Sequence, residues 1–184
     1  SVVQKGPFVQ GSNIIIRPLD SNFLETGKSV TTQTNDNFGS FEVAESLSGS
    51  YVEIEADGYY FNEVKGKISD GPITLRTIVP LDEEEVNVNL LTTLASERIK
   101  YLVKEEGMNY SDAKKQAENE ILESFNIPTE IIDQISSFEK MDISKSGTEN
   151  AILLAISSTI LGDQDPGALT QTMSEIINDI KEDG

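Results

Sequence analysis

The residues Ser50-Tyr-Val-Glu-Ile-Glu-Ala56 decide the fold of the first half of the chain. Residues at the even positions are small or apolar, and they alternate with Tyr51 and two glutamates. A period of two is typical of a β-strand that has one face on a core and the other toward solvent. We therefore expect a strand here, with Val52 and Ile54 on its buried face.

Further short strands flank this one on both sides. Ile73-Thr-Leu-Arg-Thr-Ile-Val79 repeats the alternation, and turn residues such as Asp57-Gly58 separate the segments. Many short strands at close spacing indicate an antiparallel β-sandwich over residues 1–80. The other expected strands are Asn13–Arg17, Ser29–Thr34, Ser40–Val43 and Tyr60–Val64.

The composition changes at Pro80, which predicts a domain boundary. The chain has 184 residues, enough for one or two domains, and most of its net charge of −18 lies after Pro80. The four carboxylates of Asp82-Glu-Glu-Glu85 cannot be buried together without partners, so we expect an acidic, solvated linker over residues 81–89. Strands followed by helices indicate two domains rather than interleaved βαβ units.

The apolar period after the linker is helical, and about five helices are expected over residues 90–184. Ser111 is interpreted as the N-cap of the second helix, and Asp165-Pro166 as the start of the last. A short third helix is expected over residues 131–138. The three clearest apolar stripes run from Leu91 to Leu102, from Ala113 to Phe125 and from Leu169 to Ile180.

The fourth expected helix, Glu149–Leu161, is apolar on most of its sides. Ser146-Gly-Thr-Glu149 reads as a capping box at its start, and Gly162 as its end. A helix that is apolar all round is typical of a buried position, so we expect this helix at the centre of the bundle.

Absent residue types exclude several kinds of chemistry. The chain has no Cys and no His, which excludes a thiol nucleophile, a thiolate zinc site and Ser-His catalysis. Its negative charge repels a phosphate backbone, so no nucleic-acid partner is expected.

No apolar run approaches the roughly 20 residues that cross a bilayer. Asn35-Asp-Asn37 is interpreted as a turn and Asp165 as a helix cap rather than calcium ligands. We predict a non-enzymatic protein with no metal and no cofactor.

The aromatic run Tyr59-Tyr60-Phe61 is the candidate ligand-binding site. Exposed rings stack on sugars, so a glycan platform is one interpretation of these residues. Successive side chains of a strand face opposite ways, so at most two of the three rings can share a face. The alternative is a buried corner in which one Tyr hydroxyl is bonded to the backbone.

Two stretches resemble a known family. Thr34-Asn-Asp-Asn-Phe-Gly-Ser-Phe41 and Gly49-Ser-Tyr-Val-Glu-Ile-Glu-Ala-Asp-Gly-Tyr59 resemble the carboxypeptidase-regulatory-like, or transthyretin-like, β-sandwich module. The family's turn motif is matched by Asp36 and Gly39, and Phe41 would then point into the core. The sequence departs from the family at Asn35, where the family usually has Thr.

A more specific resemblance is to surface lipoproteins of Gram-negative bacteria. It rests on Lys5-Gly-Pro-Phe8 and Gly58-Tyr-Tyr-Phe-Asn62, and it extends to Leu91-Thr-Thr-Leu94 and Met141-Asp-Ile-Ser144. In those proteins a helical region follows the sandwich. The resemblance implies export to the cell envelope and a lipid anchor upstream of Ser1. It carries over no catalytic residue.

The sequence as a whole predicts an α+β protein of two domains. Residues 1–80 are expected to form a transthyretin-like β-sandwich, and residues 90–184 an all-α bundle of about five helices. The expected function is attachment, display or assembly at the outer surface of the cell, with an unidentified protein or glycan as partner. The alternatives are a glycan-binding module, or an accessory module of a longer secreted enzyme.

Overall fold

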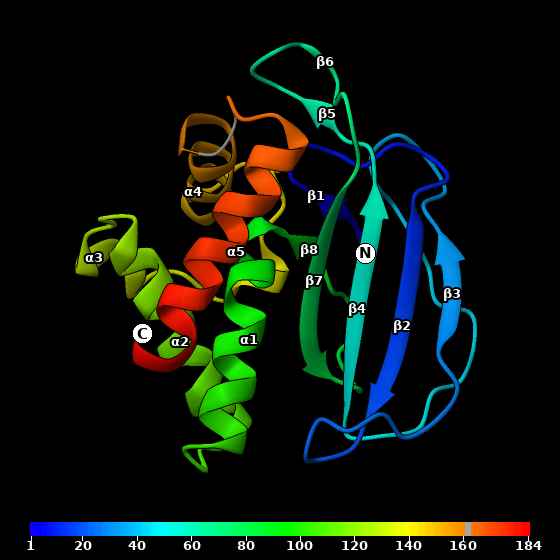
Figure 1. The fold of residues 1–184 in the computed structure, drawn as a ribbon, viewed down its shortest axis with the longest axis vertical. Helices are drawn as coiled ribbons and strands as arrows, with labels where there is room; N and C mark the ends of the chain where they lie inside the picture. Colours follow the sequence, from blue (N-terminus) through cyan, green and yellow to red (C-terminus); the bar gives the residue numbers. More distant parts are fainter. Residues whose placement is uncertain (161–162) are drawn as a thin grey trace.

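The computed structural model describes residues 1–160 and 163–184, without the side chains of residues 159 and 160, and it has a mixed α/β fold (Figure 1). The main sheet is antiparallel, with the strands in the order β3 (Val30–Gln33), β2 (Asn13–Leu19), β4 (Tyr51–Gly58) and β7 (Ile73–Pro80). Two short pairs accompany it: β1 (Val3–Gln4) parallel to β8 (Val88–Asn89), and β5 (Phe61–Asn62) antiparallel to β6 (Lys67–Ile68).

The described part of the chain contains five α-helices. They are α1 (Leu90–Lys104), α2 (Tyr110–Ser124), α3 (Thr129–Ile132), α4 (Thr148–Ala155) and α5 (Pro166–Asp183). A 3-10 turn, η1 (Phe138–Lys140), precedes α4, and a π-helical turn, η2 (Ile156–Ile160), follows it. The expected third helix is therefore divided between α3 and η1. Asp165 caps α5 as expected, since its carboxylate accepts a hydrogen bond from the Ala168 amide, whereas α2 is capped by Asn109 and not by Ser111.

Strand β4 confirms the expected alternation between a buried and a more exposed face over residues 51–56. It lies between β2 and β7, and Ile54 is paired with Ile16 on one side and with Thr77 on the other. Val52, Ile54 and Ala56 are buried, while Tyr51, Glu53 and Glu55 are only half-buried. The residues that the period of two assigned to the buried face therefore lie on the apolar face of the sheet.

Irregular segments cover part of this apolar face. The turn at residues 35–40 is held by the Asp36 carboxylate, which accepts hydrogen bonds from the amides of Phe38 and Ser40. Gly39 has a φ of +78°, and a Cβ there would lie 2.3 Å from the carbonyl oxygen of Val3. Glycine thus allows the turn to approach β1 closely, and it leaves Phe41 buried.

The expected strand at Ser40–Val43 is wrong. Ser40 makes one isolated bridge with Val2, and the Phe41 amide donates to the carbonyl of Ser1. Residues 40–43 therefore contact the N-terminal segment through one bridge and do not form a β-ladder with it. Among the described residues, the three sheets above are the ladders of the fold, so a β-sandwich followed by a separate bundle is not confirmed.

Helices α1 and α5 contact β7, and α1 packs against both α2 and α5 (Figure 1). Hydrogen bonds tie α1 to the strand: the Thr92 hydroxyl donates to the Arg76 carbonyl, and the Arg76 amide donates to the Thr93 hydroxyl. The Tyr110 hydroxyl of α2 donates to the Ile78 carbonyl at 2.7 Å. The buried apolar side chains of both halves form one continuous core.

The segment expected to be an acidic linker has an exposed part and a buried part. Asp82, Glu84 and Glu85 are exposed. Val86 and the residues of β8 are buried, and the side chain of Asn89 caps α1 while donating to the Phe138 carbonyl. This second part connects β1, η1 and α1.

Helix α4 differs most from expectation. It begins at Thr148 with Gly147 as N-cap, and no capping box forms because Glu149 instead accepts hydrogen bonds from the amide and hydroxyl of Ser136. Leu153 is fully buried, but Leu154 is 39% exposed. The prediction of a helix buried on all sides is therefore wrong for the described residues, since one face of α4 remains open. The expected end of this helix at Gly162 lies outside them.

Candidate functional site

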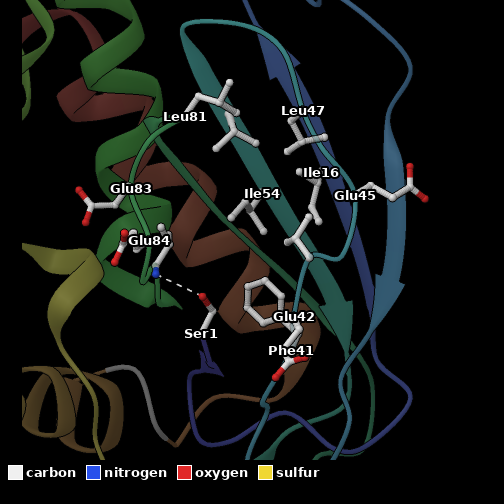
Figure 2. Close-up of a pocket in the computed structure, with 13 residues that line it drawn as sticks. Ser1, Ile16, Phe41, Glu42, Glu45, Leu47, Ile54, Leu81, Glu83 and Glu84 are labelled. Carbon is white, nitrogen blue, oxygen red and sulfur yellow. Dashed lines mark hydrogen bonds between the residues drawn. The ribbon is translucent and has the colours of Figure 1, made fainter.

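A hollow of about 490 Å³ lies on the apolar face of the main sheet (Figure 2). Its floor comes from β2 and β4, through Ile16, Val52 and Ile54. One wall is the irregular segment 41–47, and the other is the segment 81–86 that follows β7. The size is within the usual range of ligand sites, roughly 300–1,000 Å³. The apolar lining residues are Ile16, Phe41, Val43, Leu47, Val52, Ile54, Leu81 and Val86.

Four glutamates surround the apolar interior, and we call this site the acidic hollow. Glu42 and Glu45 lie on one wall and Glu83 and Glu84 on the other, while apolar side chains such as Ile54 occupy the middle (Figure 2). Glu42, Glu45 and Glu84 are exposed, whereas Phe41 and Val86, which flank them in the two walls, are buried. The lining also includes Ser1, whose hydroxyl accepts a hydrogen bond from the Val86 amide at 3.2 Å.

Most of the rim charge has no counter-charge within the described residues. Glu83 is paired with Lys140, which also donates to the Glu85 carbonyl at 2.8 Å. No ion pair is formed there by Glu42, Glu45 or Glu84, and no Lys or Arg belongs to the lining. The hollow therefore offers an apolar surface inside a field of negative charge, which favours a positively charged group beside an apolar one.

The three aromatic residues expected to form a site do not act together. Tyr60 is fully buried and stacks on Phe8 with ring centroids 6.4 Å apart, whereas Tyr59 and Phe61 are 45% and 41% exposed. Alternation along an extended chain places the two exposed rings opposite to Tyr60. The predicted bond from a buried Tyr hydroxyl to the backbone is not found at Tyr60 among the residues that the structure describes.

A buried polar group lies beside Tyr60. Lys5 is fully buried, and its ammonium lies 5.2 Å from the centre of the Tyr60 ring. Burial lowers the pKa of Lys5, although the charge of Glu63 opposes this, and burial raises the pKa of Glu63. Solvent does not reach the Lys5 ammonium, so this group contributes to the interior rather than to a binding surface.

Neither a metal centre nor a membrane helix is found in the parts of the chain that the structure describes. There, no three carboxylates are grouped to hold a metal ion. No described helix has both the length and the apolar content to cross a bilayer.

Comparisons of this chain with protein-family models, with curated proteins and with solved structures found no match. The resemblances described above therefore remain expectations from the sequence.

The residues of the acidic hollow were missed by the sequence analysis. Their two walls lie about forty positions apart, and each places glutamate next to an apolar residue, as in Glu42-Val43 and Glu85-Val86. What the sequence did not show is that both segments cover the same face of the sheet.

Proposed function

We propose that this protein is a non-catalytic binding module of the cell envelope, and that the acidic hollow binds a cationic, amphipathic segment of a partner protein. One observation carries the proposal: an apolar floor on the main sheet is surrounded by four glutamates, three of which have no ion pair within the described residues. The envelope location, and a lipid anchor upstream of Ser1, are supported by the sequence resemblance alone.

The chemistry of the hollow favours this partner over a small anion or a neutral ligand. An apolar side chain that enters the hollow is removed from water against Val43, Leu47 and Leu81, which is favourable by about 25 cal/mol for each Å² buried. A Lys or Arg next to it relieves the repulsion between Glu42, Glu45 and Glu84. Charge at the rim then provides specificity and a fast encounter, while the apolar contact provides most of the affinity.

The test is a titration with a short synthetic peptide that alternates Lys and Phe, followed by fluorescence anisotropy. The variant Glu42→Gln/Glu45→Gln/Glu84→Gln should bind it about tenfold more weakly, since three partly exposed ion pairs at about 0.5 kcal/mol each approach the 1.4 kcal/mol of a tenfold change. The matched control is Glu105→Gln/Glu106→Gln/Glu130→Gln, which removes three exposed carboxylates elsewhere.

Two further measurements sharpen this experiment. Leu47→Ser, in the wall of the hollow, should also weaken binding, because it removes apolar contact without changing charge. A peptide with Glu in place of Lys should not bind. If both triple variants lower the affinity equally, the peptide responds to net charge alone, and the hollow is not its site.

Glycan binding is a second candidate, favoured by the exposure of Tyr59 and Phe61. Two rings on one side of an extended segment can stack on a sugar, whereas Tyr60 is buried and cannot. A glycan array with Tyr59→Ala and Phe61→Ala variants distinguishes this function from peptide binding, because neither residue lines the acidic hollow.

A further inference from the structure

The β5–β6 hairpin, residues 61–68, carries an exposed apolar surface. Phe61 and Ile68 are cross-strand partners and are 41% and 54% exposed, and Val64 in the turn is 50% exposed. The hairpin extends beyond the end of the main sheet (Figure 1). An exposed apolar pair in a projecting hairpin is typical of a contact site, because a cross-strand pair presents both side chains on one face.

The exposed charge of the same hairpin is positive on a strongly negative protein, because the carboxylate of Glu63, its one acidic residue, is buried. Lys65 and Lys67 are both exposed, whereas the chain has a net charge of −18. Lys67 contacts Asp70 at 2.9 Å, an exposed pair that contributes little and is easily exchanged for another. Lys65 makes no ion pair within the described residues. The hairpin thus combines the two properties that the acidic hollow favours, an apolar surface and neighbouring cations.

The hairpin and the hollow lie at opposite ends of one strand. The hollow uses Val52 and Ile54, in the first half of β4, and its walls include Leu47 and Leu81 at the start of β4 and the end of β7. The hairpin follows Gly58, the last residue of β4. Because β4 is a continuous strand, the hairpin of a molecule cannot reach the hollow of the same molecule.

We propose that the β5–β6 hairpin of one copy docks in the acidic hollow of a second copy, so that the protein assembles head to tail. The proposal rests on the proposed function and names its partner as this chain itself. Phe61 and Ile68 contact the apolar floor, and Lys65 and Lys67 lie against the glutamates of the rim. A docked pair still presents one free hairpin and one free hollow, so the contact produces chains or rings rather than a closed dimer.

The expected association is weak. The hollow is lined by 13 residues, fewer than the roughly 20–30 residues on each side of a standard stable interface. The overall negative charge of the copies also opposes association outside the contact. Oligomers should therefore form in a concentration-dependent manner, with the monomer dominant in dilute solution.

Sedimentation velocity over a range of concentrations tests the proposal, with two variants that each remove one side of the contact. The hairpin variant is Phe61→Ser/Ile68→Ser, and the hollow variant is Glu42→Gln/Glu45→Gln/Glu84→Gln. The wild-type protein should form species larger than a dimer, and each variant alone should lose at least about tenfold in association constant. The matched control Leu24→Ser/Phe38→Ser, which removes exposed apolar side chains elsewhere, should associate like the wild type.

The decisive measurement is a mixture of the two variants. The hairpin variant keeps its hollow and the hollow variant keeps its hairpin, so the mixture should form a 1:1 dimer that does not grow. A wild-type protein that stays monomeric up to about 1 mM would overturn the proposal, because a dissociation constant above this value is too weak for a specific contact. So would a mixture that remains monomeric, or a hairpin variant that assembles like the wild type.

These outcomes separate the assembly from the proposed function. A monomeric wild-type protein whose hollow still binds the Lys-Phe peptide removes the second copy as partner and leaves the binding module. A hollow variant that loses peptide binding but assembles like the wild type removes the hollow from the assembly and leaves it as the peptide site. Circular dichroism of each variant, with the wild-type spectrum expected, shows that the substitutions at these exposed positions leave the fold intact.

Discussion

At the residue scale, Asp142 connects the N-terminal segment to the helical part of the chain. Its carboxylate accepts hydrogen bonds from the side chain of Gln4, at 3.0 Å, and from the amide and hydroxyl of Ser144. Gln4 completes the connection by accepting from the Ile143 amide. Burial by itself would raise the pKa of Asp142, but these hydrogen bonds outweigh it and lower the pKa below its ordinary value.

Asp142→Asn should therefore lower the free energy of unfolding by about 1.5–3 kcal/mol at neutral pH, the range for hydrogen bonds to a charged group. A carboxyl whose pKa is lowered in the folded state stabilises the protein above its unfolded pKa of about 3.9, and this contribution is lost as the pH falls through the folded pKa. The difference between wild type and variant should accordingly shrink below about pH 4. Urea denaturation across pH measures it, with exposed Asp133→Asn as the control. A constant difference at all pH values would show that the charge of Asp142 has no part in it.

At the element scale, adjacent residues of α4 have opposite environments. Leu153 is fully buried and Leu154 is 39% exposed, because only one face of the helix meets the core. Leu153→Ala should lower the free energy of unfolding by about 2–5 kcal/mol, through lost burial and the cavity that remains. Leu154→Ala should change it by less than about 1 kcal/mol, as at other surface positions. Chemical denaturation of both variants measures this, and equal losses would place Leu154 in a contact that the single chain lacks.

Strand β4 and helix α4 also show what the sequence could and could not predict. Alternation along β4 reports two different environments, so the buried face could be assigned to Val52 and Ile54 from the pattern alone. A helix that is apolar on all sides gives no sign of which face is buried. Its burial depends on neighbours that come from distant parts of the chain. The acidic hollow was unpredictable for the same reason, since the segments at 41–47 and 81–86 meet only in the folded protein.

At the scale of the whole molecule, the sheet and the helices share one apolar core. The sequence predicts two domains that separate near Pro80. In the structure, β8 follows that point and pairs with β1, and Asn87 accepts a hydrogen bond from the Val2 amide while donating to the Met141 carbonyl. Helix α1 also covers β7, with Lys100 bonded to Glu53 of β4 at 2.5 Å. One continuous core therefore spans the predicted boundary.

This continuity predicts how the two halves behave when they are separated. Residues 81–184 expressed alone expose the apolar side chains of α1 that face β7, and β8 loses its partner strand. An isolated helix gains most of its stability from such packing rather than from its own propensity. We therefore expect the fragment to show much less helix by circular dichroism than the intact chain, and to regain it when residues 1–80 are added. A fragment that is fully helical and melts cooperatively by itself would instead establish the two-domain division, because the contacts across Pro80 would then be dispensable for folding.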